Sequence, residues 1–175
     1  MKLSFSTNGW DDFDWTDFYV TAKDLQFDGI EIHDVKREVF SGKNRPFNSE
    51  NIVETAHKLA QMELTIPCLD TTCDVSDETK IDENVAEIEE YIKIAYREAD
   101  NNGISILIET VGPYTDTERL RNVLNVFARD NVAALWDIHH TVRYGNETPE
   151  KTIQNLGAYV KHVHIKDSEV VDGNI

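Results

Sequence analysis

The sequence is poor in cysteine and in long apolar runs. Its two cysteines, Cys68 and Cys73, fit no zinc-binding pattern, and in a cytosolic chain they indicate thiols rather than a disulfide. No apolar run approaches the about 20 residues of a membrane span, and the N-terminal stretch MKLSFSTNGW lacks the apolar core of a signal peptide. We therefore expect a cytoplasmic protein that has no membrane partner.

Basic residues are also scarce. The 175 residues include 17 Lys and Arg against 33 Asp and Glu, which gives a formal net charge of −16. Such a surface repels nucleic-acid backbones and anionic membranes, so no nucleic-acid partner is expected. The acidic residues are spread along the chain, which is typical of solvated helix faces. A small anionic substrate is not excluded, because a pocket can be locally positive.

Short apolar runs alternate with helical patterns along the whole chain. Six runs rich in Ile, Val and Leu predict buried parallel strands: KLSFST near the start, then 28–35, 64–71, 104–111, 132–139 and 160–167. Apolar residues at helical spacing predict helices over 14–25, 49–62, 82–99, 117–127 and 149–159, with Ser49, Thr117 and Thr148 as N-caps.

This alternation predicts an α/β fold with a parallel sheet. No Gly-rich turn follows the first strand, which argues against a dinucleotide-binding fold. A (β/α) TIM-type barrel fits better, and we expect residues 1–175 to form a single domain of this kind. In such barrels the functional residues lie at the carboxyl ends of the strands.

Carboxylates and histidines stand at nearly every one of these strand ends. Glu109, Asp137 and His164 follow three successive predicted strands, so a nearly closed sheet would point them at one spot. Oxygen and imidazole ligands suit Mn²⁺, Mg²⁺, Co²⁺ or Zn²⁺. The stretch AALWDIHHTVRYG, 133–145, raises most directly the question of whether a strand ends at a metal site, because an apolar run stops at Asp137 and two histidines follow.

Each of these residues also has an ordinary structural interpretation. Asp137 at a strand end is a candidate helix cap or turn residue, and His164 can be satisfied by a backbone carbonyl group. Lys166 can form a local ion pair with Asp167, and His139 would point to the opposite side of the chain if its strand continued past Asp137. An isolated buried carboxylate at Glu109 would be costly, which favours a ligand role there.

Four motifs in this order resemble the sugar isomerase/epimerase superfamily of TIM barrels, which is related to xylose isomerase and endonuclease IV: GIEIHD, ILIET, WDIHH and HVHIKD. The resemblance implies a divalent metal held by Glu109, Asp137, His164 and a second Glu. It also implies that Glu109 transfers a proton beside a carbonyl group, and that His140 and Lys166 face the substrate. Arg143 and His33 are further candidates for substrate contact.

The sequence departs from that family in length. A complete barrel has eight strands and about 250 residues, whereas this chain shows about six strand-like runs. The fourth unit, expected between Ile81 and Gly103, and the eighth, which would carry the second Glu, are absent from the pattern. Open sheet edges then favour a homodimer.

The expected function is that of a metal-dependent isomerase or epimerase of a sugar or sugar-like substrate. The alternative is a non-catalytic or degraded barrel that still binds metal or sugar. A third possibility, phosphodiester cleavage, needs several more metal ligands, and the net charge and the six histidines argue against it.

Overall fold

The computed structural model describes residues 1–71 and 104–168. The chain divides into two compact units, Met1–Thr72 and Cys73–Ile175. Each unit contains a three-stranded parallel sheet, as the alternating pattern predicted. The helix expected over 82–99, the stretch expected to lack the fourth unit, and Cys73 lie outside the described residues. The expectation of a single domain therefore stays a prediction.

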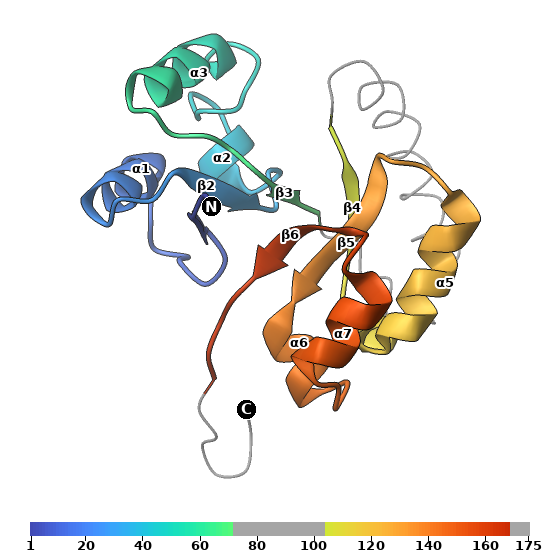
Figure 1. Ribbon diagram of the computed structural model, residues 1–175. Coiled ribbons are helices and arrows are strands. Elements are labelled where there is room, and N and C mark those ends of the chain that lie inside the picture. Colours follow the sequence, from blue (N-terminus) through green and yellow to red (C-terminus); the bar gives the residue numbers. More distant parts are fainter. Residues whose placement is uncertain (72–103, 169–175) are drawn as a thin grey trace. The chain divides into compact units, whose positions relative to one another are not determined.

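The first unit begins with β1 and ends with β3 (Figure 1). Its sheet has the order β1-β2-β3, and its elements are β1 Ser4–Ser6, α1 Trp15–Asp24, β2 Gly29–His33, α2 Glu38–Ser41, α3 Ile52–Gln61 and β3 Leu69–Asp70. Helix α1 starts with a capping box. The side chain of Asp14 accepts the backbone N–H group of Asp17, and the side chain of Asp17 accepts that of Asp14. The prediction of Ser49 as a cap was wrong, because α3 begins only at Ile52, after Asn51.

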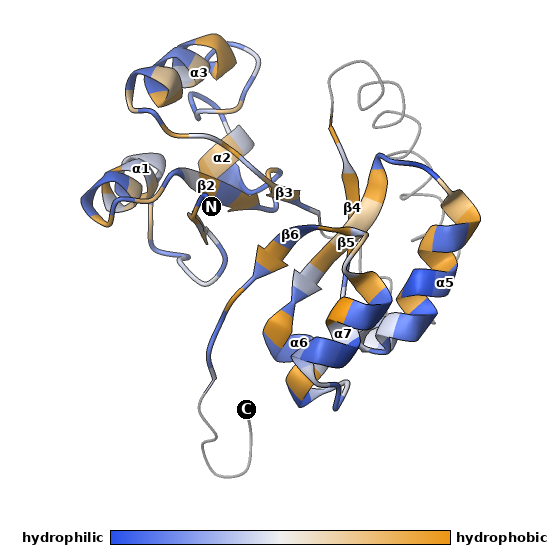
Figure 2. Ribbon diagram, viewed as in Figure 1, coloured by the Kyte–Doolittle hydropathy of each residue, from blue (hydrophilic) through white to orange (hydrophobic). Residues whose placement is uncertain are grey.

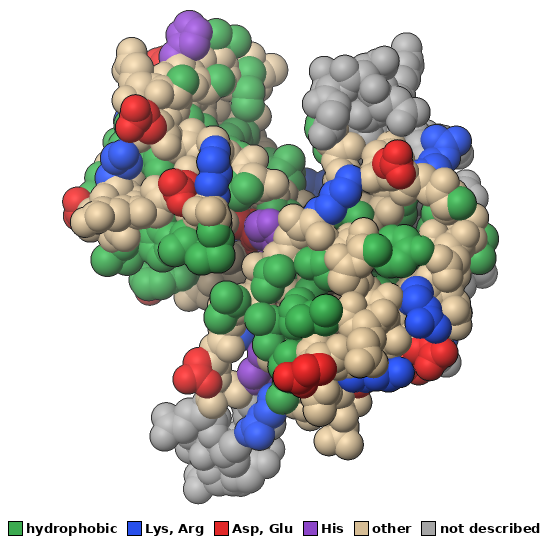
Figure 3. Space-filling view, viewed as in Figure 1, with side chains coloured by type: hydrophobic (Ala, Val, Ile, Leu, Met, Phe, Trp, Pro, Cys, Tyr) green, Lys and Arg blue, Asp and Glu red, His purple; other side chains and the backbone are tan. Residues whose placement is uncertain are grey.

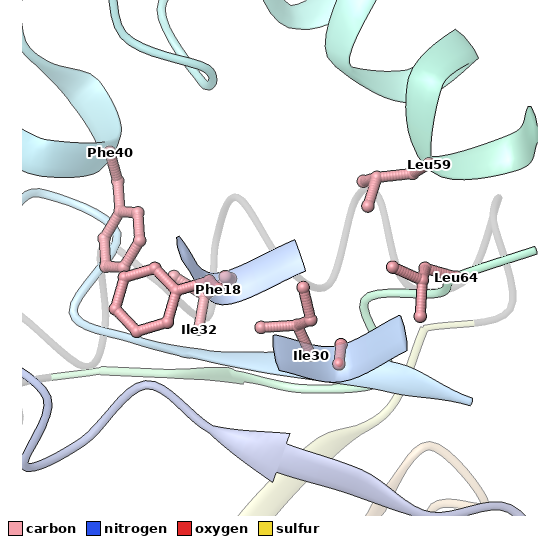
Figure 4. Close-up of a cluster of buried hydrophobic side chains, with 7 residues drawn as sticks. Phe18, Ile30, Ile32, Phe40, Leu59 and Leu64 are labelled. Carbon is pink, nitrogen blue, oxygen red and sulfur yellow. The ribbon is translucent and has the colours of Figure 1, made fainter. Parts of the chain in front are cut away.

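The core of the first unit lies between its sheet and its helices (Figure 4). Alternation along β2 buries Ile30 and Ile32, and the helices bring apolar side chains onto them. The buried cluster consists of Phe18, Ala22, Ile30, Ile32, Phe40, Leu59 and Leu64. This packing fixes the carboxyl end of β2, where His33 lies.

The second unit carries the motifs around Asp137 (Figure 1). Its elements are β4 Ile106–Glu109, the short 3₁₀ helix η2 Gly112–Thr115, α5 Thr117–Phe127, β5 Val132–Asp137, α6 Ile138–Arg143, α7 Pro149–Leu156 and β6 Val160–His164. Helices α5 and α7 pack against the sheet through Leu120, Leu124 and Leu156, which meet Val132 and Ala134 of the central strand. The strands β4 and β5 are largely hydrophobic, whereas α5 and α7 are two-faced (Figure 2).

Helix caps decide where several of these elements begin. The cap of α5 is Asp116, whose side chain accepts the N–H groups of Glu118 and Arg119, so the prediction of Thr117 as cap was wrong by one residue. Thr148 caps α7 as predicted. The strand predicted over 132–139 ends at Asp137, because α6 begins at Ile138 with Asp137 as its cap.

The strand register of the second unit sets the site. Along the β4–β5 ladder Glu109 is paired with Leu135, and along the β5–β6 ladder Asp137 is paired with His164. The register shifts between Ala134 and Leu135, which marks an irregularity in the central strand. The carboxyl ends of the three strands therefore lie side by side.

The described surface is mixed in character. The face shown in Figure 3 carries acidic and basic side chains scattered among hydrophobic and uncharged polar ones. In the part of the chain that the structure describes, no helix is long and apolar enough to cross a membrane.

Candidate metal centre

Three of the predicted ligands meet at the carboxyl ends of the strands β4, β5 and β6. Glu109, Asp137 and His164 each offer one ligand atom, and these atoms all lie within 4.8 Å of one another. Glu109 Oε1 is 3.3 Å from His164 Nδ1. The side chains of Glu109 and His164 are 27% and 23% exposed, so a small ligand can reach them. The convergence inferred from the strand ends is therefore present in the second unit.

Asp137 uses its two carboxylate oxygens differently. Oδ1 accepts the backbone N–H group of His140 at 2.9 Å and so caps α6. Oδ2 lies 2.8 Å from Lys166 Nζ and 3.5 Å from His140 Nδ1. The side chain is 1% exposed, so this charge is removed from water and compensated by its neighbours. Asp137 is therefore both a helix cap and a candidate ligand, and the two interpretations of its position are compatible.

Thr110 holds the backbone of Asp137 in place, a role that the sequence did not reveal. Its hydroxyl oxygen accepts the Asp137 N–H group at 2.9 Å, and the hydroxyl group donates to the Asp137 carbonyl oxygen at 3.2 Å. Thr110 is fully buried. A threonine next to a strand-end glutamate has no distinctive sequence pattern, so only the structure identifies this contact.

His140 lies between the carboxylates and Lys166. Its Nε2 atom is 2.9 Å from Lys166 Nζ, and its Nδ1 atom is 3.5 Å from Asp137 Oδ2 and 3.9 Å from Glu109 Oε1. An ammonium group can only donate, so Nε2 must accept and the ring proton is assigned to Nδ1, facing the two carboxylates. The imidazole therefore lies between the cation and the two acidic groups, and its buried Nδ1 atom forms no hydrogen bond with either carboxylate.

The electrostatic environment keeps Asp137 charged and His140 neutral. Burial raises the pKa of Asp137, but the hydrogen bonds from Lys166 and from the His140 backbone, together with their charges, hold that pKa below its ordinary value. Burial lowers the pKa of His140 and the charge of Lys166 lowers it further, against the raising effect of Asp137 and Glu109. Near neutral pH the site therefore holds an anionic carboxylate beside an uncharged imidazole.

His139 also faces this region. The expectation that it points away depended on a strand continuing past Asp137, and that strand ends there. On the first turn of α6, a ring nitrogen of His139 lies within 4.8 Å of ligand atoms of Asp137 and His140, and Nε2 is 2.6 Å from Ser168 Oγ.

Two further residues were predicted to contact the substrate, Arg143 and His33. Arg143 is exposed in the last turn of α6, at the opposite end of that helix from Asp137, so the structure does not bring it into the cluster. His33 lies in the first unit at the end of β2, where its Nδ1 atom is 2.6 Å from Asp70 Oδ2. The alternative in which Lys166 pairs locally is wrong in its partner, because the ion pair is with Asp137.

The donors present fit a divalent metal. Two carboxylates and one imidazole converge from three neighbouring strands, and one of the carboxylates is buried. Oxygen and nitrogen donors of this kind suit Mn²⁺, Mg²⁺, Co²⁺ or Zn²⁺. Three protein ligands leave coordination positions open, which is typical of catalytic rather than structural sites.

Two solved structures share this fold. The crystal structure of the probable 3-DHS dehydratase AsbF, involved in petrobactin synthesis in Bacillus anthracis, is 16% identical with a TM-score of 0.68, and the match covers 95% of this chain and 73% of that one. A xylose isomerase domain protein from Planctomyces limnophilus is 15% identical with a TM-score of 0.63, and the match covers 95% of this chain and 74% of that one. Identities this low establish the fold alone.

The comparison with protein families identifies a family, whereas the structural comparison identifies only a fold. No curated protein matches the chain. The family described as a xylose isomerase-like TIM barrel matches residues 76–175, which include the motifs around Glu109, Asp137 and His164. The structure describes six strands in two three-stranded sheets, whereas a complete barrel has eight strands. The chain thus belongs to the xylose isomerase-like TIM barrel family.

Proposed function

We propose that the protein is a cytoplasmic, metal-dependent isomerase or epimerase that acts on a small sugar or sugar-like substrate. The observation that carries the proposal is the convergence of Glu109, Asp137 and His164 at the carboxyl ends of three adjacent parallel strands. Catalytic residues of TIM barrels lie at this end of the strands. The membership of the chain in the xylose isomerase-like family supports the choice of substrate class.

The chemistry expected of such a site is proton transfer beside a carbonyl group. A divalent cation held by these three residues would polarise the substrate oxygens. Glu109 is the residue to which we assign proton transfer, since its carboxylate is partly exposed at the edge of the cluster. Neutral His140 and charged Lys166 would orient hydroxyl or anionic groups of the substrate, with Arg143 and His33 as further candidates for contact.

The substrate can be a sugar or a sugar-like acid. One structural relative is named as a probable dehydratase, and dehydration can share with isomerisation an initial proton abstraction next to a carbonyl group. The alternative proposal is a non-catalytic barrel that binds metal or sugar. The support for this alternative is the ion pair between Asp137 and Lys166, which already neutralises one carboxylate.

The metal site is tested by comparing two substitutions of one residue. Asp137→Asn keeps an oxygen that can cap α6 but removes the charge, whereas Asp137→Ala removes both. We expect both variants to lose Mn²⁺ affinity by at least about tenfold in calorimetry, because an anionic ligand is lost. Asp137→Ala should in addition lose about 1 kcal/mol of stability relative to Asp137→Asn. Wild-type affinity in both variants would exclude Asp137 as a ligand.

Activity is tested by exchange of substrate protons with deuterated solvent, followed by NMR across a panel of ketoses and hydroxy acids with Mn²⁺ added. An isomerase or epimerase exchanges the proton next to the carbonyl group without losing water, whereas a dehydratase releases water. A Glu109→Gln variant should abolish either reaction. Mn²⁺ binding without exchange in any substrate would favour the non-catalytic alternative.

We further propose that the protein forms a homodimer. Among the residues that the structure describes, each three-stranded sheet has two edge strands, β1 and β3 in the first unit and β4 and β6 in the second. Val163 on β6 and Ile165 just beyond it are 40% and 80% exposed. Exposed edge strands with apolar side chains favour pairing with a second copy.

A further inference from the structure

Lys166 occupies a specific place beside the candidate ligands. Its Nζ atom lies 2.8 Å from Asp137 Oδ2 and 2.9 Å from His140 Nε2. Lys166 follows His164 by two residues, the spacing at which side chains of an extended chain point to the same face. The cation therefore reaches the cluster from the same segment that supplies the histidine ligand.

The oxygen that Lys166 holds is the one that a metal would need. Oδ1 of Asp137 accepts the N–H group at the start of α6, which leaves Oδ2 as the oxygen that is available to a metal. A divalent cation held by Oδ2 would lie next to Nζ, because Nζ is 2.8 Å from the same oxygen. A divalent cation and an ammonium group that close together repel each other strongly in a buried site.

The two partners of this ion pair differ in their freedom to move. The Asp137 side chain is 1% exposed and accepts the His140 N–H group of α6, and the Asp137 backbone is held by Thr110. The Lys166 side chain is 45% exposed. Lys166 also lies beyond the end of β6, outside the strand ladder. The lysine stem can therefore rotate into water while the aspartate stays in place.

We propose that Lys166 is an internal counter-cation of the metal-free protein, which metal binding displaces from Asp137. This inference rests on the proposed metal site and adds a competitor to it. In the metal-free protein the ammonium group compensates a carboxylate that would otherwise be buried without a cationic partner. A divalent cation held by Asp137 would compensate it instead, and Lys166 would then leave Asp137 and His140. The Lys166 ammonium group and His140 Nε2 would thus become available to a substrate only after the metal is bound.

The test is a calorimetric titration of the full chain with Mn²⁺, using variants matched in charge. Lys166→Gln removes the competing cation, and Lys151→Gln, on the exposed side of α7, makes the same change in net charge elsewhere in the unit. Lys166→Arg retains a cation at the site. We expect Lys166→Gln to bind Mn²⁺ about three- to tenfold more tightly than wild type, whereas Lys151→Gln and Lys166→Arg stay within about twofold.

A second measurement uses no metal. In EDTA, Lys166→Gln should unfold about 2–4 °C below Lys151→Gln, because Asp137 loses its counter-cation. Equal or weaker Mn²⁺ binding by Lys166→Gln, or an unchanged unfolding temperature in EDTA, would overturn the role of Lys166 and leave the metal site standing. No Mn²⁺ binding by any variant would overturn the metal site and this inference with it. Binding by Lys166→Gln alone would support both.

Discussion

The hydroxyl group of Thr110 is the smallest feature on which the site depends. Thr110 comes directly after β4, just beyond the paired residues of the β4–β5 ladder. Its hydroxyl group forms hydrogen bonds with both the backbone N–H group and the carbonyl oxygen of Asp137. We expect Thr110→Val to destabilise the protein by about 1–3 kcal/mol, because a buried N–H group and a buried carbonyl group lose their partner while the shape is retained. Urea denaturation followed by circular dichroism measures this difference.

The matched control for that variant is Thr110→Ser, which keeps the hydroxyl group and removes only a methyl group. It should lose about 1 kcal/mol or less. If both variants were equally stable, the hydroxyl group would contribute nothing beyond its packing, and the position of Asp137 would depend on the ladder alone.

The individual candidate ligands were predictable where the strand pattern was clear. Glu109, Asp137 and His164 each end an apolar run, and parallel strands bring their carboxyl ends to one edge. Partners were less predictable, because a hydrogen bond between distant residues has no local signature. The contacts of Thr110 with Asp137, and of Lys166 with Asp137 rather than Asp167, join residues 27 or more positions apart and appear only in the structure.

At the scale of elements, the start of α5 depends on one carboxylate. Asp116 Oδ1 accepts the N–H groups of both Glu118 and Arg119 at 3.1 Å. We expect Asp116→Ala to lose about 1 kcal/mol of stability in urea denaturation, whereas Asp116→Asn, which retains a capping oxygen, should lose only a few tenths. Equal losses in the two variants would show that charge at the helix N-terminus matters and the hydrogen bonds do not.

The strands and the long helices were predictable and the short helices were not. All six strands and the helices α1, α3, α5 and α7 lie within the predicted ranges, because apolar runs mark the strands and a sustained apolar period marks these helices. The helices α2, η2 and α6 have four to six residues each, too few for a period to emerge. Because α6 was not predicted, the predicted strand ran two residues past the end of β5, and His139 was expected to point away from the site.

At the scale of the whole molecule, the prediction that can be measured directly is the homodimer. The chain has a mass of 20.0 kDa. We expect light scattering at micromolar concentration to give about twice that mass, because open sheet edges pair with one another. A mass near that of one chain would exclude the dimer.

A variant pair shows whether β6 forms the contact. Val163→Lys places a charge on this edge strand and should yield monomers, since charged residues on edges prevent pairing. Val126→Lys places the same charge on α5, at a side chain that is 85% exposed, and should leave the dimer intact. A dimer in both variants would exclude β6 as the interface.

The double use of Asp137 has a consequence for how descendants of this barrel diverge. A lineage that lost the proposed metal site would still need a capping oxygen where α6 begins, so selection for stability would retain Asp or Asn at this position. Glu109 and His164 lie on strands and cap no helix, so helix capping does not preserve them. When relatives of this chain are aligned, an aspartate in the WDIHH position is therefore poor evidence of a shared metal site. The glutamate and the histidine are the more informative positions, because the proposed metal site requires them and helix capping does not.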